Sequence, residues 1–211
     1  MSELILLKDK ISAGKLEEAR AIVTAALEEG VTPEVIINDN MVKGMEEIGH
    51  KYEEGKAFVP NLLLAARAMR GCLEILTPYM KDNSVSSLGT VIIGTVQGDL
   101  HDIGKNLVAS MLEGCGFKVI NLGVDVSADR FIAAVKEHNA DIVCLSALLT
   151  TTMNYMKDVV EAFKAAGLRD KVKIMVGGAP LSQEFCDKIG ADGFSVNANG
   201  AVLLAKSLIG R

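Results

Sequence analysis

The sequence has no excess of positive charge: 22 Lys and Arg stand against 27 Asp and Glu, which gives a formal net charge of −5. A protein that binds phosphate backbones by counterion release needs the opposite sign. The charge balance therefore argues against a nucleic-acid partner. Apolar residues make up 49% and charged residues 23% of the 211 residues, which is ordinary globular usage and excludes a disordered chain, a collagen or a coiled-coil rod.

Cysteine is scarce, and its spacing offers no zinc site. The four cysteines lie 29 to 43 residues apart, without a C-x-x-C pair and without histidine at zinc-ligand spacing. We expect buried thiols in a reducing compartment. The longest apolar run near the N-terminus is four residues, so neither a signal peptide nor a membrane span is expected. These features predict a cytoplasmic protein without a membrane partner.

The first part of the chain shows helical periodicity and almost no strand pattern. Apolar stripes at helical spacing predict helices over 2–11, 16–27, 33–52 and 60–77. Pro33 suits the first position of its helix because it lacks an N–H. The segment KDNSVSSL at 81–88 is polar and rich in serine, as linkers are. We therefore expect a four-helix bundle domain at 1–88 and a second domain at 89–211.

The period changes after this linker. Five short β-branched runs occur at 90–96, 118–122, 141–145, 173–176 and 193–196, each followed by a helical pattern. Alternating strands and helices predict a five-stranded parallel sheet of the Rossmann or flavodoxin-like class. In that topology ligands bind beyond the carboxyl ends of the first and third strands, where the strand order reverses. The loops after Val96 and Leu145 are therefore the places to look for a site.

The first of these loops reads QGDLHDIGKN at 97–106. It lacks the middle glycine of G-x-G-x-x-G, and it departs from a P-loop in its glycine spacing and in having Asn106 after the lysine. Nucleotide binding is therefore disfavoured. Asp99 can instead accept one imidazole N–H of His101 and make the other nitrogen a better ligand or base. The alternative is an exposed loop histidine with Asp99 as a helix N-cap.

Three elements together resemble the signature of cobalamin-binding domains, in their order and in their strand context. They are D-x-H-x-x-G at 99–104, S-x-L at 146–148 and Gly177-Gly178. The run GDLHDIGKNLV and the preceding KYEEGKAFVPNLLLAARAM are similar to the cobalamin-binding region of methionine synthase and to small corrinoid methyl-carrier proteins. The resemblance covers almost the whole chain. Because 211 residues cannot hold the other domains of methionine synthase, the small corrinoid carriers are the better match.

The resemblance implies a role for each matched residue. His101 would replace the nucleotide base of the cofactor as the lower axial ligand of cobalt, Asp99 would hold its second nitrogen, and the Thr152 hydroxyl would complete the hydrogen-bond chain. Small or hydroxyl-bearing residues would form the slot for the nucleotide tail. These slot residues are Gly104, Gly123, Ser146, Thr150, Gly177, Gly178 and Ala179. Leu148 of the S-x-L element completes the expected cofactor-binding set in this domain. Without the other two motifs, an ordinary strand-to-helix turn would be the preferred interpretation of Gly177–Pro180.

The helical bundle would act as a cap, with Tyr52 and Val59 over the upper face of the corrin. Both residues have a structural alternative, since Tyr52 ends a core stripe and Val59 precedes Pro60 where a staple residue would lie. For Val59 the two interpretations are equally weighted.

The implied function is a methyl carrier in one-carbon metabolism that is not catalytic alone. It would carry a methyl group on the cobalt of cobalamin or a related corrinoid, whose methylated form arises in the cycle. Its partners would be a substrate-specific methyltransferase, a second methyltransferase that uses tetrahydrofolate or a thiol, and a reductive activator. The alternatives are a cobalamin-dependent sensor or regulator, disfavoured by the absence of Trp and of a basic helix-turn-helix, and the cobalamin subunit of a radical mutase.

Overall fold

The computed structural model describes residues 4–79 and 87–210 and divides the chain into two compact units. One comprises Met1–Ser87 with Glu113–Gly116, and the other comprises Leu88–Leu112 with Phe117–Arg211. The expected linker at 81–88 falls outside the described residues except for its last two positions. No helix in the described ranges is both long enough and apolar enough to span a bilayer.

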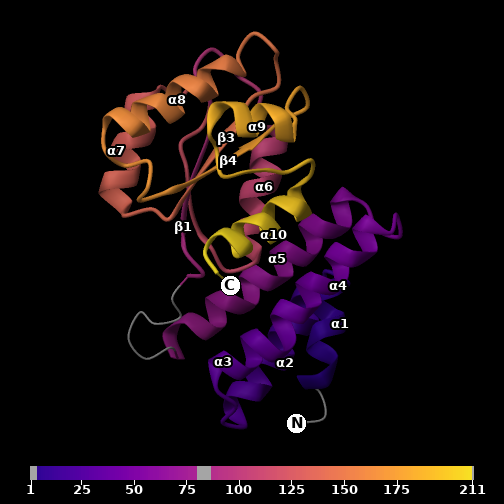
Figure 1. Ribbon diagram of the computed structural model, residues 1–211. Helices are drawn as coiled ribbons and strands as arrows, with labels where there is room; N and C mark the ends of the chain where they lie inside the picture. The colour runs from indigo at the N-terminus through magenta and orange to yellow at the C-terminus, as the bar shows by residue number, and fades with distance from the viewer. Residues whose placement is uncertain (1–3, 80–86, 211) are drawn as a thin grey trace. The chain divides into compact units, whose positions relative to one another are not determined.

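The first unit is helical (Figure 1). Its elements are η1 (Leu4–Leu6), α1 (Leu7–Ser12), α2 (Leu16–Glu28), α3 (Pro33–Ile36), η2 (Ile37–Met41), α4 (Val42–Glu53), α5 (Val59–Leu76) and η3 (Thr77–Tyr79). The expected stripes form its core, in which Leu7, Val23, Met41 and Leu62 are fully buried. A helix turns its i, i+3 and i+4 positions to one side, so these stripes meet in the centre of the bundle.

Two expected helices differ in detail. The helix expected over 33–52 contains a π-helical turn at Ile37–Met41. This turn includes Asp39 and Asn40, and Asn and Asp side chains compete for backbone hydrogen bonds. The Asn40 side chain donates to the carbonyl of Val35 at 3.3 Å. The last helix begins at Val59 rather than Pro60, and its first turn is closed by the Asn61 side chain, which accepts from the Phe58 N–H at 2.9 Å.

Glu47 on α4 supplies an electrostatic contribution to this unit. Its carboxylate lies 2.6 Å from Lys51 Nζ and 2.8 Å from Lys8 Nζ, and the hydrogen bonds from Lys51 and Lys8 lower its pKa from 4.5 to about 2. A lowered pKa stabilises the folded state above pH 4.5, and this stabilisation is lost as the pH falls toward 2. Because Lys8 and Lys51 are half-exposed, solvent screens their attraction to Glu47 and limits this stabilisation to about 1 kcal/mol.

We therefore expect Glu47→Gln to lower the free energy of unfolding by about 1 kcal/mol at pH 7 and to make no difference near pH 2. Denaturant unfolding followed by circular dichroism across this range measures the effect. Glu74→Gln, which changes an exposed carboxylate of α5, is the control. A loss in Glu47→Gln that does not shrink as the pH falls would contradict the electrostatic origin.

The second unit is the expected parallel five-stranded sheet, in the order β2-β1-β3-β4-β5. Its elements are β1 (Thr90–Thr95), α6 (Ile103–Gly114), β2 (Lys118–Asn121), α7 (Ala128–His138), β3 (Ile142–Ser146), α8 (Asn154–Ala165), β4 (Lys173–Gly177), α9 (Gln183–Ile189), β5 (Gly193–Phe194) and α10 (Ala198–Leu208). This is the flavodoxin-like strand order, whose topological switch point lies between β1 and β3. The predicted fold class is confirmed.

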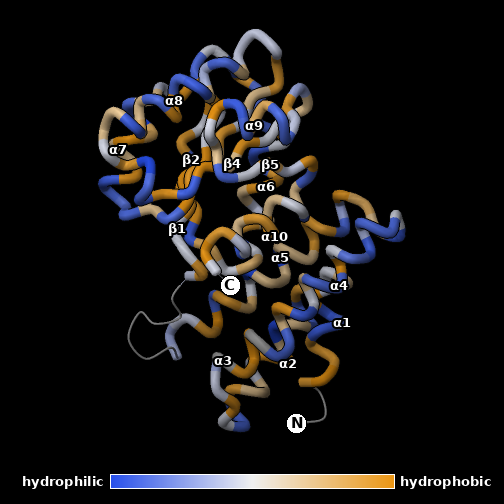
Figure 2. The backbone as a smooth tube through the Cα atoms, viewed as in Figure 1, coloured by the Kyte–Doolittle hydropathy of each residue, from blue (hydrophilic) through white to orange (hydrophobic). Residues whose placement is uncertain are grey.

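Apolar strands lie between two layers of helices in this unit. Residues of α7, α8 and α9 share one core cluster with the strands, including Phe131, Val160, Phe163 and Cys186. The strand segments are orange and the outer sides of α7 and α8 are largely blue in the hydropathy view (Figure 2). A strand buried on both faces needs a continuous apolar run, which is the pattern of Val91, Ile92 and Ile93.

The strand register fixes the position of the site. Thr95 of β1 is the register partner of Ser146 of β3, and Ser146 is in turn the partner of Gly177 of β4. The loops after these strands therefore leave the sheet at the same edge. The last strand ends at Phe194, earlier than expected, and the adjacent Ser195 hydroxyl donates to the carbonyl of Asn197 at 2.7 Å.

Candidate functional site

The candidate site lies where the loops after β1 and β3 meet at the carboxyl edge of the sheet. The β1 loop turns at Gly98, whose φ of +81° is one that glycine adopts without strain. The loop then presents Asp99 and His101 before α6 begins at Ile103. The β3 loop presents Leu148 and Thr152. The switch point of the sheet thus brings together residues that are about fifty positions apart in the sequence.

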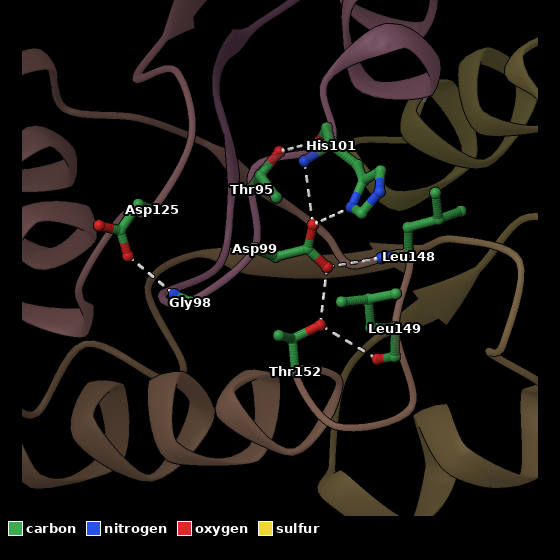
Figure 3. A network of polar contacts seen from close by, with 8 residues as sticks. All are labelled: Thr95, Gly98, Asp99, His101, Asp125, Leu148, Leu149 and Thr152. Carbon is green, nitrogen blue, oxygen red and sulfur yellow. Dashed lines mark hydrogen bonds and ion pairs between the residues drawn. The ribbon is translucent and has the colours of Figure 1, made fainter.

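Asp99 is the centre of this site and is fully buried. Its Oδ1 accepts from the His101 N–H at 3.0 Å and lies 2.7 Å from His101 Nδ1. Its Oδ2 accepts from the Leu148 N–H at 2.8 Å and from the Thr152 hydroxyl at 2.7 Å (Figure 3). Burial raises the pKa of this carboxyl group, but the hydrogen bonds, that from Thr152 foremost, outweigh it and hold the pKa well below its ordinary value.

His101 combines an anchored nitrogen with an exposed ring. Its Nδ1 donates to the buried carboxylate in the tautomer that this contact favours, which leaves Nε2 as the outer nitrogen. The side chain is 49% exposed. The N-cap alternative for Asp99 is wrong, because α6 begins four residues later and the carboxylate is engaged by His101, Leu148 and Thr152. The geometry is that of a histidine held ready to bind a metal or to exchange a proton.

Thr152 is buried and links the two loops. Its hydroxyl lies 2.7 Å from Asp99 Oδ2 and 3.0 Å from the carbonyl oxygen of Leu149. The hydroxyl therefore extends the chain of polar contacts from the imidazole through the carboxylate into the β3 loop (Figure 3). Leu148 contributes through its backbone N–H, while its side chain is exposed.

The other residues expected in the slot lie at the ends of strands, in the loops that follow them, or, for Gly104, in the first turn of α6. An added Cβ at Gly104 or Gly123 would meet nothing within 4 Å, and at Gly177 only the carbonyl oxygen of Ser195 at 3.8 Å. Gly178 is different. Its φ is +146°, and an added Cβ would lie 1.8 Å from the carbonyl oxygen of Ala147, so the fold itself requires glycine there.

Tyr52 and Val59 belong to the helical unit. Tyr52 is half-buried near the end of α4, and Val59 is exposed as the first residue of α5. Phe58, which the sequence analysis did not select, is 68% exposed beside Val59. An exposed aromatic ring next to an exposed valine is a surface suited to an apolar ligand, and the role of these residues over a corrin stays a prediction.

Two polar residues that the sequence did not single out, Thr95 and Asp125, also bind the site loop. The Thr95 hydroxyl donates to the carbonyl of His101 at 2.8 Å, and Asp125 accepts from the Gly98 N–H at 2.7 Å. A fully buried threonine in the apolar strand TVIIGT is a signal that could have been read from the sequence. Asp125 gives a weaker signal, since a carboxylate in a loop is ordinary.

Comparisons with known proteins agree with this geometry. A family model described as B12 binding domain matches residues 89–203, and a second model with the same description matches residues 6–77. The chain is 45% identical over 211 residues to trimethylamine corrinoid protein 2 of Methanosarcina mazei, covering 98% of this chain and 97% of that protein. It is 46% identical over 204 residues to the dimethylamine corrinoid protein of Methanosarcina barkeri, covering 96% and 95%.

A similar structure has been solved for a chain of a methyltransferase complex. A chain of the methanol:cobalamin methyltransferase complex from Methanosarcina barkeri superposes with a TM-score of 0.85 at 31% identity, covering 99% of this chain and 80% of that chain. The two domain matches together span the helical unit and the sheet. This chain therefore belongs to the family of B12-binding corrinoid proteins, whose cofactor is cobalamin or a related corrinoid.

Proposed function

We propose that this protein is a methyl carrier that accepts a methyl group from a methylamine:corrinoid methyltransferase and passes it to a second methyltransferase. The observation that carries the proposal is the half-exposed His101, whose Nδ1 is fixed 2.7 Å from the buried Asp99 carboxylate. A histidine so anchored has a single orientation for its outer nitrogen, as a metal ligand needs.

The residues present fit a corrinoid. Next to His101, the side chains of Leu100 and Ile103 are 71% and 86% exposed, and apolar side chains so exposed mark a surface that a ligand or partner covers. Gly104 adds open space at the start of α6. We infer that His101 Nε2 would take the lower axial position on cobalt, and that the open positions at Gly104, Gly123 and Gly177 would leave room for the nucleotide tail.

A bound corrinoid supplies a nucleophilic cobalt that can take up and release a methyl group. The protein's residues would control how the imidazole takes part. Asp99 fixes its tautomer and its orientation as a ligand, because the carboxylate accepts the Nδ1–H. Thr152 and the Leu148 N–H keep that carboxylate ionised and in place. The protein thus holds the proton at Nδ1 whether or not Nε2 is engaged.

The names of the relatives indicate the methyltransferases with which this protein would work. Two of them are named for trimethylamine and dimethylamine, and the neighbouring structure is a methyltransferase complex. We propose a methylamine as the methyl donor and a thiol or tetrahydrofolate as the acceptor. The helical unit would cover the methyl group between transfers, with Tyr52 and Val59 facing the corrin, and the domains 1–88 and 89–211 would separate when a partner docks.

Reconstitution with hydroxocobalamin under reducing conditions tests the proposal. We expect about one corrinoid per chain, with the nucleotide base displaced from cobalt in the absorption spectrum. The reduced protein is then offered to methyltransferases for tri-, di- and monomethylamine, each with its own substrate, and to the methanol enzyme with methanol. Methylation with a methylamine pair supports the proposal. Methylation with methanol alone would overturn the donor class, and no corrinoid binding would overturn the function.

A further inference from the structure

The backbone of the His101 loop is held by contacts that do not involve the Asp99 carboxylate. At its base, Asp125 Oδ1 accepts from the Gly98 N–H at 2.7 Å, and the Asp125 N–H donates to the Asp99 carbonyl at 3.1 Å. One residue of the β2 loop therefore binds two peptide groups of the β1 loop, which lie on either side of the Gly98–Asp99 peptide. Such a pair of bonds fixes both the position and the tilt of the peptide between them.

The other end of the loop is held from inside the sheet. Thr95 is fully buried, and its hydroxyl donates to the His101 carbonyl at 2.8 Å. A buried hydroxyl without a partner would destabilise the fold, so this bond both satisfies Thr95 and holds the backbone of His101. Asp125 and Thr95 thus hold the loop at its two ends, as Figure 3 shows.

The conformation of Asp125 shows what its carboxylate adds. Its φ is +53°, one of two such values among the described non-glycine residues, the other being Asn139 at +48°. Glycine adopts this conformation without strain, and aspartate is one of the few other residue types that visit it. The Gly98 bond is the one that the side chain of Asp125 makes.

We propose that Asp125 and Thr95 are positioning residues that set the distance of His101 from cobalt through the backbone, separately from the side-chain contacts of Asp99 and Thr152. This inference rests on the proposed function. The Asp99 carboxylate holds the imidazole ring and the His101 N–H from one side, whereas Asp125 and Thr95 hold the peptide groups at the start of the loop and at the His101 carbonyl. A loop that is fixed at Gly98, at Asp99 and at the His101 carbonyl would hold the imidazole at a single distance from cobalt.

The test removes each bond while leaving its backbone able to fold. Asp125→Gly keeps the positive φ and loses the acceptor, while Asp125→Asn keeps both the φ and an acceptor oxygen. Thr95→Val loses the hydroxyl at nearly constant volume, and Thr95→Ser keeps it. Asn139→Gly is the matched control, because it removes a side chain at the other positive φ, at the C-cap of α7.

The first measurement uses the protein without corrinoid. Asp125→Gly should raise the amide hydrogen-exchange rate of Gly98, whose N–H loses its acceptor, by about threefold to tenfold, the effect of losing one hydrogen bond. Thr95→Val releases the His101 carbonyl, so the loop should open more often and the exchange rate of the His101 amide, which stays bonded to Asp99, should rise by about threefold to tenfold. Asp125→Asn, Thr95→Ser and Asn139→Gly should leave these rates near the wild type. Unchanged exchange in Asp125→Gly and Thr95→Val, or an equal rise in Asn139→Gly, would overturn the proposal even if no corrinoid bound.

The second measurement uses the protein loaded with hydroxocobalamin. Histidine ligation stabilises cobalt(II) relative to four-coordinate cobalt(I), so ligation weakened about threefold to tenfold should make the cobalt(II)/cobalt(I) potential more positive by about 30 to 60 mV, at 59 mV per tenfold change. The nitrogen splitting in the cobalt(II) electron paramagnetic resonance spectrum should weaken in parallel. Faster exchange with an unchanged potential would show that the contacts stabilise the loop without positioning the ligand.

Discussion

Replacing His101 by alanine is expected to leave the fold and corrinoid binding intact but to remove the nitrogen ligand from cobalt. A loop tip contributes little to the core, and the ring is 49% exposed. Loss of the residues that support a metal ligand lowers activity by about 10- to 100-fold, so loss of the ligand itself should lower methyl transfer by about 100-fold or more. The nitrogen splitting in the cobalt(II) electron paramagnetic resonance spectrum should disappear.

His138→Ala is the matched control, since His138 is a histidine in the last turn of α7, away from the site loops. It should leave both the spectrum and the transfer rate unchanged. Added imidazole should partly restore the nitrogen splitting to His101→Ala, because the vacated position is open to solvent. If His101→Ala retained the splitting without imidazole, another group would be the ligand and the assignment of His101 would be wrong.

The fold could be predicted from the sequence because its two units have different periods. Buried residues at every position of 91–93 mark a strand covered on both faces, whereas stripes at helical spacing mark the bundle. The departures occur where local polar groups act. Asp39 and Asn40 lie in a π-helical turn, and β5 ends at Phe194, next to a Ser195 hydroxyl that is bonded to the Asn197 carbonyl. Such local competition leaves the apolar pattern unchanged, so periodicity does not detect it.

The site could be predicted only in part, for a geometric reason. Asp99 and His101 are two residues apart, so their contact is visible in the sequence, and Thr152 was selected through a resemblance. Asp125 was not found, because it binds a backbone N–H, and almost every residue has one. The relevant signal is in the topology: β1 and β2 pair in parallel, with Thr90 opposite Lys118. Their following loops are therefore neighbours, and the polar residues of one can bind the backbone of the other.

Gly104 gives the second expected result, because an added Cβ would meet nothing at Gly104 but would collide with the backbone at Gly178. Gly104 is the second residue of α6, is exposed, and has nothing within 4 Å of an added Cβ. Gly104→Ala should keep the fold and stabilise the corrinoid-free protein by up to about 0.5 kcal/mol, because alanine favours a helix. Gly178→Ala should destabilise it by about 2 kcal/mol or more, because the Cβ would collide with the Ala147 carbonyl.

A side chain at position 104 should weaken corrinoid binding, although it does not destabilise the corrinoid-free protein. If the nucleotide tail passes this position, a side chain there overpacks the ligand, and Gly104→Leu should weaken hydroxocobalamin binding by about 10-fold or more. Gly104→Ala should have a smaller effect of the same sign. Thermal unfolding of the corrinoid-free protein and equilibrium dialysis with hydroxocobalamin measure the two quantities separately. Wild-type affinity in Gly104→Leu would show that the tail does not pass Gly104, and the assignment of this glycine to the slot would then be wrong.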